Sequence, residues 1–297
     1  MATIDPTPTL ETVTQPGTTS FRTPPDLKAR LKNSYDVIAP FYNQWTLSHR
    51  AQRMDYATKL IHFLQRDNRQ TGQNGDSADN TDETELEHPP HQHGDSADDT
   101  DETETEHPPH QHGSPIPSLR HMHALEVGCG SGVPVLEILL AKEMDVIGVD
   151  LSATQLALAN AHFPNQTSGL QAVWAEEDMM DLRYPPDEFD VVVGLYSLIH
   201  LPREEQTVFL HRVFRWLKPG GMLLMNFPVE EVEGAITQHW LGHQQGWMFW
   251  SGWGEEKTMQ IIDELGPGGM EVLLREVTEH GSTGDKIMWI IAKKRRV

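Results

Sequence analysis

The chain has 297 residues, of which 37% are hydrophobic, and its 23 lysine and arginine residues against 44 aspartate and glutamate residues give a formal net charge of −21 at pH 7. This acidic balance argues against nucleic acid or an anionic membrane surface as a partner, because both bind through clustered lysine and arginine. A single cysteine excludes an internal disulfide framework and any metal site built from several cysteines.

No apolar run in the sequence is long enough to cross a bilayer, and the first residues lack the basic and apolar regions of a secretory signal. We therefore expect a soluble protein of the cytoplasm. The basic run at 293–296 keeps a nuclear location as an alternative, although four basic residues at a solvated end commonly carry no signal.

Four stretches of different character divide the chain. Residues 1–26 are rich in proline and threonine and predict a disordered arm. Residues 27–66 carry apolar residues at helical spacing, interrupted at Pro40, and predict a helical segment. Residues 67–118 predict a disordered linker, and residues 119–297 predict the folded core.

The linker contains a tandem duplication of 19 residues over 75–112, GDSADNTDETELEHPPHQH followed by GDSADDTDETETEHPPHQH. This block holds 13 acidic residues and no lysine or arginine, so it accounts for most of the excess charge. Its histidine clusters offer weak binding of Zn²⁺ or Cu²⁺ as an alternative. We favour a solvated spacer, since a preformed metal site needs rigid supporting groups.

Beyond the linker, apolar runs alternate with amphipathic segments. Strands are predicted at 123–127, 145–149, 170–174, 189–195, 222–226, 270–277 and 286–292, and helices at 133–142, 153–162, 203–217 and 255–265. Ser152 and Gln155 predict a capping box at the start of the second of these helices. The alternation indicates an α/β fold, a mostly parallel sheet with helices on both faces and an antiparallel strand from the last hairpin.

Four signals follow the ends of predicted strands, where ligands of such sheets bind. The loop at 126–132, EVGCGSG, has glycines that permit close backbone approach to a ligand. Asp150 can accept the hydroxyls of a ribose. Asp178 and Met179 suit an adenine edge and face, and the segment 195–200 follows the next strand. The loop spacing G-x-G-x-G differs from the G-x-G-x-x-G of dinucleotide enzymes.

With these motifs in this order, the chain resembles the class I S-adenosylmethionine-dependent methyltransferases that act on small molecules. The resemblance covers about 119–297 and the helices at 27–66, and it implies a Rossmann-like sheet of seven strands, one of them reversed. It also implies S-adenosyl-L-methionine as the cofactor and S-adenosyl-L-homocysteine as the product. The implied cofactor residues are Tyr35, Tyr42, Glu126, Gly128, Cys129, Gly130, Asp150, Leu151, Gln155, Asp178, Met179 and Leu195.

By this resemblance, Glu126 and its loop would line the methionine part, and the Leu195 carbonyl would meet the methionine ammonium. Asp150 would bind ribose with Leu151 beside it. Residues 27–66, with Tyr35 and Tyr42, would form a cover over the cofactor. The duplicated linker departs from the family pattern, because it separates this cover from the core.

We expect in-line transfer of a methyl group to an O, N or S atom of a small molecule, such as a secondary metabolite. His200 is the candidate general base and Tyr196 a candidate for orienting the acceptor. The alternative for His200 is a role in capping a helix. The alternative for Tyr196 is a place in the hydrophobic core.

The segment 239–253, HWLGHQQGWMFWSGW, predicts a mobile lid that clamps a flat or cationic acceptor through Trp240, Trp247, Trp250 and His243. A small secondary core is the alternative. If the segment is helical, His239 and His243 are neighbours one turn apart. His239 would then be a second candidate base, or the two histidines could be metal ligands. No other metal-ligating residue converges on them in the sequence, so we expect metal-independent chemistry.

We expect the small-molecule acceptor to be the partner of this protein, and we expect it to bind neither nucleic acid nor a membrane. We expect the protein to be a monomer or a homodimer. No Asn/Asp-Pro-Pro-Tyr follows the fourth strand, which disfavours methylation of nucleic acid bases. The alternative function is a cofactor-binding regulatory or scaffold protein without methyl transfer. A third is a cyclisation in which the cofactor serves only as a cation.

Deleting residues 75–112 should leave the melting temperature and turnover nearly unchanged, because a solvated acidic spacer has no apolar face to bury. Thermal unfolding and turnover of the deletion variant beside the full chain measure this. Loss of folding in the deletion variant would contradict the linker assignment.

Overall fold

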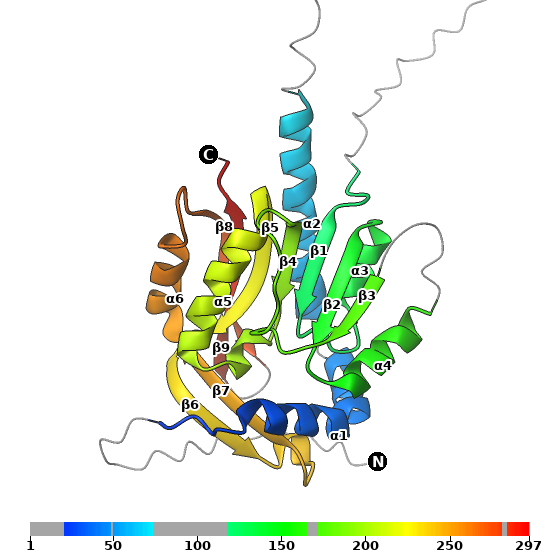
Figure 1. The fold of residues 1–297 in the computed structure, drawn as a ribbon, viewed down its shortest axis with the longest axis vertical. Helices are drawn as coiled ribbons and strands as arrows, with labels where there is room; N and C mark the ends of the chain where they lie inside the picture. Colours follow the sequence, from blue (N-terminus) through cyan, green and yellow to red (C-terminus); the bar gives the residue numbers. More distant parts are fainter. Residues whose placement is uncertain (1–20, 49, 74–117, 165–171, 281–283, 297) are drawn as a thin grey trace, which may run out of the picture. The chain divides into compact units, whose positions relative to one another are not determined.

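The structure is a computed structural model that describes residues 21–48, 50–73, 118–164, 172–280 and 284–296 (Figure 1). Most of the predicted arm and linker, including the duplication at 75–112, lies outside the described residues. The chain divides into two compact units, one formed by residues 1–64 with 119–297 and the other by residues 65–118. The second unit is described only at 65–73 and at Ser118.

A seven-stranded sheet lies at the centre of the first unit, in the order β3-β2-β1-β4-β5-β9-β8. Only β9 runs against the other six strands. This arrangement confirms the predicted mostly parallel sheet with one reversed strand. The strands are β1 (His123–Val127), β2 (Asp145–Asp150), β3 (Ala172–Glu176), β4 (Phe189–Gly194), β5 (Leu217–Pro228), β8 (Met270–His280) and β9 (Asp285–Lys294).

Helices cover both faces of this sheet, as predicted. The core helices begin and end within two residues of their predicted bounds. Figure 1 shows α5 and α6 in front of the sheet and α2 behind it. The helices are α1 (Leu27–Ser48), α2 (Arg50–Gln73), α3 (Val135–Ala141), α4 (Ala153–His162), α5 (Arg203–Trp216) and α6 (Gly254–Asp263), with the short 3₁₀ turns η1 (Leu198–His200) and η2 (Trp240–Gly242).

Successive side chains of a strand point to opposite faces of the sheet, so the apolar core divides into two clusters, one on each face. In β1, Leu125 and Val127 face the cluster that α5 and α6 complete. Ala124 faces the other cluster, to which α2 and α3 contribute. The ring of Tyr56, on α2, lies parallel to that of Trp289, on β9, with centroids 4.0 Å apart. The helix α2 is therefore part of the sheet's own packing.

The predicted interruption at Pro40 is wrong, since α1 continues through this residue to Ser48. A proline inside a helix removes one hydrogen bond and crowds the preceding turn. Here the two residues before it, Ile38 and Ala39, are fully buried. Tertiary packing of this turn outweighs the local cost, and the helix extends to Ser48.

A second sheet was not predicted. Its two antiparallel strands are β6 (Glu231–Gln238) and β7 (Trp247–Trp253). The helical interpretation of 239–243 is wrong, because His239 has a left-handed φ of 52° and leads into η2 instead. The Trp-rich segment is thus a strand and a tight turn.

Two strands of the main sheet begin two or more residues from their predicted start. The strand β5 begins at Leu217, five residues early, because Leu217 pairs with Phe189 of β4 before a register shift. The strand β3 lies two residues later than predicted. None of the helices in the described residues combines the length and the apolar character that crossing a bilayer requires.

Candidate active site

A cavity lies at the carboxyl ends of the parallel strands, lined by the loops after β1, β2, β3 and β4 and by α1 and α2. All twelve predicted cofactor residues line it, together with His200 and Tyr196. These residues come from five separate segments. The structure brings them together because the parallel strands end at one edge of the sheet. Their individual roles remain predictions.

The loop after β1 fits against its neighbours without room for a side chain at Gly128. The backbone N–H groups of Gly128 and Cys129 both donate to the Val149 carbonyl, at 2.8 and 3.0 Å. Gly128 has a φ of +69°, and a Cβ placed there would lie 2.4 Å from the Cβ of Ser197. Glycine is therefore required here both by conformation and by space.

Asp150, the last residue of β2, is fastened by backbone groups from two loops. Its Oδ2 accepts from the Gly130 N–H and its Oδ1 from the Ser152 N–H, both at 2.8 Å. Burial raises the pKa of this carboxyl to about 6, and the two backbone donors oppose that rise. Each carboxylate oxygen keeps a further lone pair with which it can accept a ligand hydroxyl.

The predicted capping box of α4 forms only in part. The Ser152 hydroxyl accepts from the Gln155 N–H at 3.2 Å, as expected of an N-cap. The Gln155 amide, however, does not return to the Ser152 N–H, because Asp150 already accepts from that group. Gln155 therefore stays available to the cavity that it lines.

Several polar atoms of the cavity wall are buried without a hydrogen-bond partner in the part of the chain that the structure describes. They are Oε2 of Glu126, both amide atoms of Gln155 and the Ser197 hydroxyl. Leaving such a group unpaired costs about 1–3 kcal/mol. This set fits a polar ligand such as the nucleoside–amino acid conjugate that the loop motifs imply.

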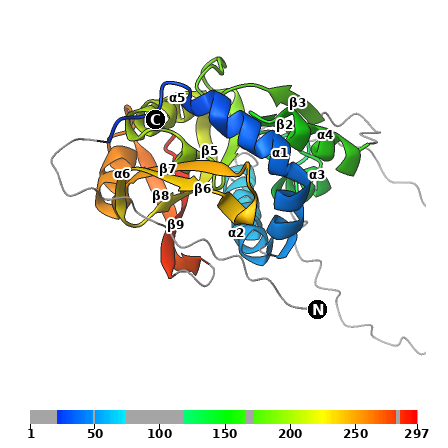
Figure 2. The ribbon, with the colours of Figure 1, turned by 90° about the horizontal axis from the view of Figure 1, so that it is seen from below.

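The helix α1 lies across the ends of β2 and β3 (Figure 2). Lys32 reaches the Leu151 carbonyl at 3.2 Å and the Glu176 carboxylate at 2.6 Å. The Ser152 hydroxyl donates to Asp36 at 2.6 Å. These contacts place Tyr35, between Lys32 and Asp36, over the cavity.

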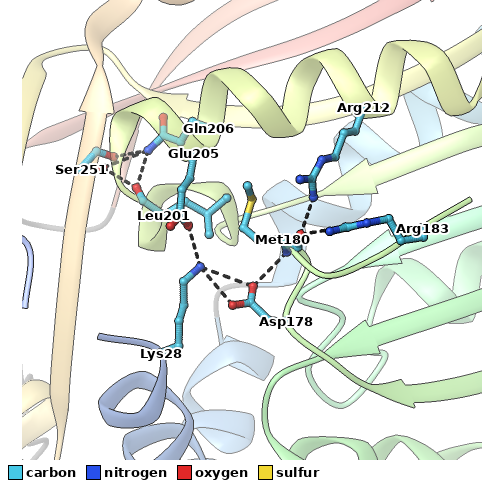
Figure 3. A network of polar contacts seen from close by, with 9 residues as sticks. All are labelled: Lys28, Asp178, Met180, Arg183, Leu201, Glu205, Gln206, Arg212 and Ser251. Atoms are coloured by element: carbon cyan, nitrogen blue, oxygen red, sulfur yellow. Dashed lines mark hydrogen bonds and ion pairs between the residues drawn. The ribbon is translucent and has the colours of Figure 1, made fainter. Parts of the chain in front are cut away.

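Asp178 makes an ion pair that the sequence did not predict. Lys28 of α1 lies 3.3 Å from its carboxylate and 2.8 Å from that of Glu205 on α5 (Figure 3). The Met180 N–H also donates to Asp178, at 2.9 Å. The adenine end of the predicted site thus joins α1, the loop after β3 and α5.

His200 is held in one tautomer by its two hydrogen bonds. Its Nδ1 lies 2.8 Å from the Phe249 carbonyl, which can only accept, so Nδ1 carries the proton. Its Nε2 then accepts from the Tyr35 hydroxyl at 2.8 Å. Burial lowers the pKa of His200 to about 4, so the imidazole is neutral at pH 7.

Tyr196 follows β4 in a left-handed conformation, with a φ of 54°. Its backbone N–H donates to Asn226 at 2.7 Å, which holds this turn in place. Its hydroxyl donates to the Gln52 side chain at 3.4 Å, and burial raises its pKa to about 12. Tyr196 therefore lines the cavity as a neutral ring.

The predicted acceptor residues of the Trp-rich segment do not line the cavity. Trp240 and Trp247 are buried in an aromatic cluster with Tyr35 and Tyr42, against which Trp250 also packs. The Trp240 ring lies 5.4 Å from Tyr42 and 6.0 Å from Tyr35. The tryptophans therefore form a layer behind the tyrosines of the wall.

His239 is exposed and His243 partly so, and neither lines the cavity. The turn between them is not an α-helix, so the expected one-turn spacing does not exist. Across the described ranges, no group of three or more His, Cys, Asp or Glu is arranged to hold a metal ion.

Sequence reasoning missed Arg53 and Lys28, both of which line the cavity. Arg53 precedes Tyr56, Ala57 and Leu60 at helical spacing, so it belongs to the buried stripe of α2. A cation on an apolar stripe is the signal that could have identified it.

Residues 124–221 match a family model described as a methyltransferase domain. The 27-O-demethylrifamycin SV methyltransferase of Amycolatopsis mediterranei is 34% identical over 101 residues, which are 34% of this chain and 36% of that relative. The O-methyltransferase rstn1 of Aspergillus nomiae is 29% identical over 106 residues, 36% of this chain and 46% of that relative. The chain thus matches less than half the length of these curated relatives.

A crystal structure of a SAM-dependent methyltransferase from Methanosarcina mazei superposes with a TM-score of 0.51 at 22% identity, over 60% of this chain and 94% of that one. This likeness supports the fold. Residues 124–221 therefore match a methyltransferase domain, and the fold is that of a SAM-dependent methyltransferase of known structure.

Substituting Gly128 by alanine should destabilise the protein by about 2–5 kcal/mol, since a left-handed conformation and overpacking against Ser197 act together. Gly242→Ala is the matched control: Gly242 has a φ of +72° and nothing within 4 Å of an added Cβ. Denaturant unfolding of both variants measures the difference. Equal losses would show that the close approach to Ser197 is unimportant.

Proposed function

We propose that this protein is a methyltransferase that uses S-adenosyl-L-methionine to methylate an O, N or S atom of a small molecule. The observation that carries the proposal is the set of unpaired, buried polar atoms of Glu126, Gln155 and Ser197 around one cavity. They lie within residues 124–221, which match the methyltransferase domain model, and polar groups of a bound cofactor would satisfy them.

The cofactor residues divide along the cavity. Glu126, Gly128 and Gly130, with the Leu195 carbonyl, would hold the methionine part. Asp150 and Leu151 would hold ribose, and Asp178 and Met179 adenine, with Cys129 and Gln155 beside them and Tyr35 and Tyr42 as the cover. When bound, the cofactor supplies a methyl group already activated by a sulfonium. The protein then contributes orientation and exclusion of water, and orientation is worth on the order of 7–11 kcal/mol.

At the acceptor end, His200 and the Tyr35 hydroxyl form a chain that can take a proton. A hydroxyl acceptor would give its proton to the Tyr35 oxygen as the Tyr35 proton moves to Nε2 of His200. Because the pKa of His200 is about 4, this is a weak base. The arrangement favours an acceptor that loses its proton readily, such as a phenol.

The names of the relatives leave the acceptor atom open. They include O-methyltransferases, a phosphoethanolamine N-methyltransferase and a sterol 24-C-methyltransferase. A secondary metabolite as acceptor, a cytoplasmic location and a monomeric or dimeric state belong to the same proposal. The scaffold alternative differs in one respect, since it predicts cofactor binding without methyl transfer.

Cofactor affinity should depend on the protonation of Asp150. Its carboxyl has a pKa of about 6 in the free protein, and the ionised form is the better acceptor for ribose hydroxyls. Affinity should therefore be full above pH 6 and fall as the pH drops through 6, by about tenfold between pH 7 and pH 5. Calorimetric titration with S-adenosyl-L-homocysteine across this range measures it.

Asp150→Asn is the control for this titration. It keeps the side-chain shape but cannot ionise, so the variant should bind weakly and lack the step near pH 6. A wild-type affinity that does not change between pH 5 and pH 7 would contradict the ribose assignment.

The central test is a screen for transfer of labelled methyl to phenols, amines, thiols and carboxylates. In a positive reaction, His200→Ala should lower turnover of a hydroxyl acceptor by about 10²–10⁴-fold while changing cofactor affinity little. His211→Ala, an exposed histidine on α5, is the matched control. Cofactor binding without transfer to any acceptor would favour the scaffold alternative, and unchanged turnover in His200→Ala would make this residue structural.

A further inference from the structure

One face of α1 carries four polar side chains that bond to the rim of the cavity, and the first two are lysines. Lys28 pairs with Asp178, in the loop after β3, and with Glu205 on α5 (Figure 3). Lys32, one turn further along, donates to the Leu151 carbonyl after β2 at 3.2 Å. These contacts tie α1 to two of the loops that form the cavity and to α5.

The other two polar side chains reach the remaining segments of the same rim. Asp36 accepts from the Ser152 hydroxyl at 2.6 Å and from the Thr154 N–H at 3.2 Å, both at the start of α4. Asn43 accepts from the Ser131 hydroxyl, in the loop after β1, at 2.6 Å. Helical spacing places all four on one face of α1. We call this set the polar stripe: Lys28, Lys32, Asp36 and Asn43.

Another face of α1 is apolar and packs on β7. Leu27, Leu31 and Ile38 are buried in one cluster with Trp247 and Phe249. Separating this face from β7 would expose apolar surface to water, which is costly. The polar stripe is different, because water can replace the partners of a part-exposed polar group at little cost. The helix is therefore held firmly by β7 and more weakly by the loops.

The lysines of the polar stripe lie where water and salt reach them. The side chains of Lys28 and Lys32 are 28% and 35% exposed. Dissolved ions screen such pairs, so their strength falls as the ionic strength rises. Lys28 also lines the cavity, so breaking its pairs with Asp178 and Glu205 opens the cavity wall at that end.

We propose that the cavity opens along the polar stripe while α1 stays on β7, and that the ion pairs of Lys28 set how often it opens. The proposal rests on the proposed function, because the molecules that pass through the opening are the cofactor and its product. Lys28 is a positioning residue in this scheme, since it holds α1 on the loops through Asp178 and Glu205. Weaker ion pairs then mean faster exchange of the cofactor.

The exchange kinetics of S-adenosyl-L-homocysteine test this proposal. In Lys28→Met, the association and dissociation rate constants should both rise by about 3- to 10-fold, and Kd should stay nearly unchanged, because easier opening speeds passage in both directions. Both rate constants of the unmodified protein should rise with salt, and those of Lys28→Met should rise less. This ligand has no net charge, so long-range attraction contributes little to the salt effect. Stopped-flow fluorescence of the tryptophans measures both rate constants.

Cys129 reports the opening without a bound ligand. It is the single cysteine of the chain, lines the cavity and is 6% exposed. Burial raises the pKa of its thiol, so it reacts slowly while the cavity is closed. Alkylation of Cys129 by iodoacetamide in the free protein should therefore be faster in Lys28→Met, by the same factor as the exchange.

Arg30→Met is the matched control for the loss of one positive charge from α1. Arg30 pairs with Asp26 and lies over the ring of Trp247 on β7, so neither exchange nor alkylation should change. Glu205→Gln removes one of the two partners of Lys28 and should give a smaller increase. Combining it with Lys28→Met should add little, since both changes break the same contact. Thermal unfolding monitors each fold, and Glu205→Gln serves as the test if Lys28→Met does not fold.

The outcomes separate this proposal from the proposed function. A raised dissociation rate alone, with Kd weakened by the same factor, would make Lys28 a direct contact of the cofactor and overturn the proposal. Unchanged exchange and alkylation in Lys28→Met would also overturn it. If the unmodified protein does not bind S-adenosyl-L-homocysteine, the proposed cofactor site fails, and the alkylation of Cys129 still decides whether the polar stripe closes the cavity.

Discussion

The cavity depends on one buried carboxylate, that of Asp150. By accepting the N–H groups of Gly130 and Ser152, it joins the loop after β1 to the start of α4. Because the Ser152 N–H donates to Asp150, the Gln155 side chain does not take its expected capping role. Burial of this carboxylate raises its pKa to about 6, so the group that organises the loops is also sensitive to mild acid.

A second constraint is the aromatic layer behind the cavity. Tyr35 and Tyr42 line the cavity with one side of their rings and pack against Trp240 with the other. His200 lies against Trp250, with ring centroids 4.8 Å apart, and its proton is fixed by the Phe249 carbonyl of β7. The Trp-rich strand therefore supports the proposed acceptor end of the cavity without lining it. Tryptophan there sets the position of the tyrosines and of the imidazole.

Charge in the cavity contrasts with charge in the sequence. The chain as a whole is strongly acidic, mostly through the duplicated linker. The cavity instead places Arg53 and Lys28 among its acidic side chains. A sulfonium nucleoside with an amino-acid tail carries both signs of charge, and this mixture of buried groups suits it better than a uniformly acidic wall would.

The sequence alone determined the order along the chain of the helices and of the seven strands of the main sheet, and its mostly parallel character, because apolar runs and glycine loops are local signals. The twelve residues that line the cavity were implied by the resemblance to the methyltransferases, and parallel topology collects their loops at one edge. It could not determine the continuation of α1 through Pro40, the strand pairing of β6 with β7, or the position of Arg53 in the cavity wall. These features depend on contacts between residues far apart in the chain. Only tertiary packing decides which local preference is overruled and which polar side chains meet in one cavity.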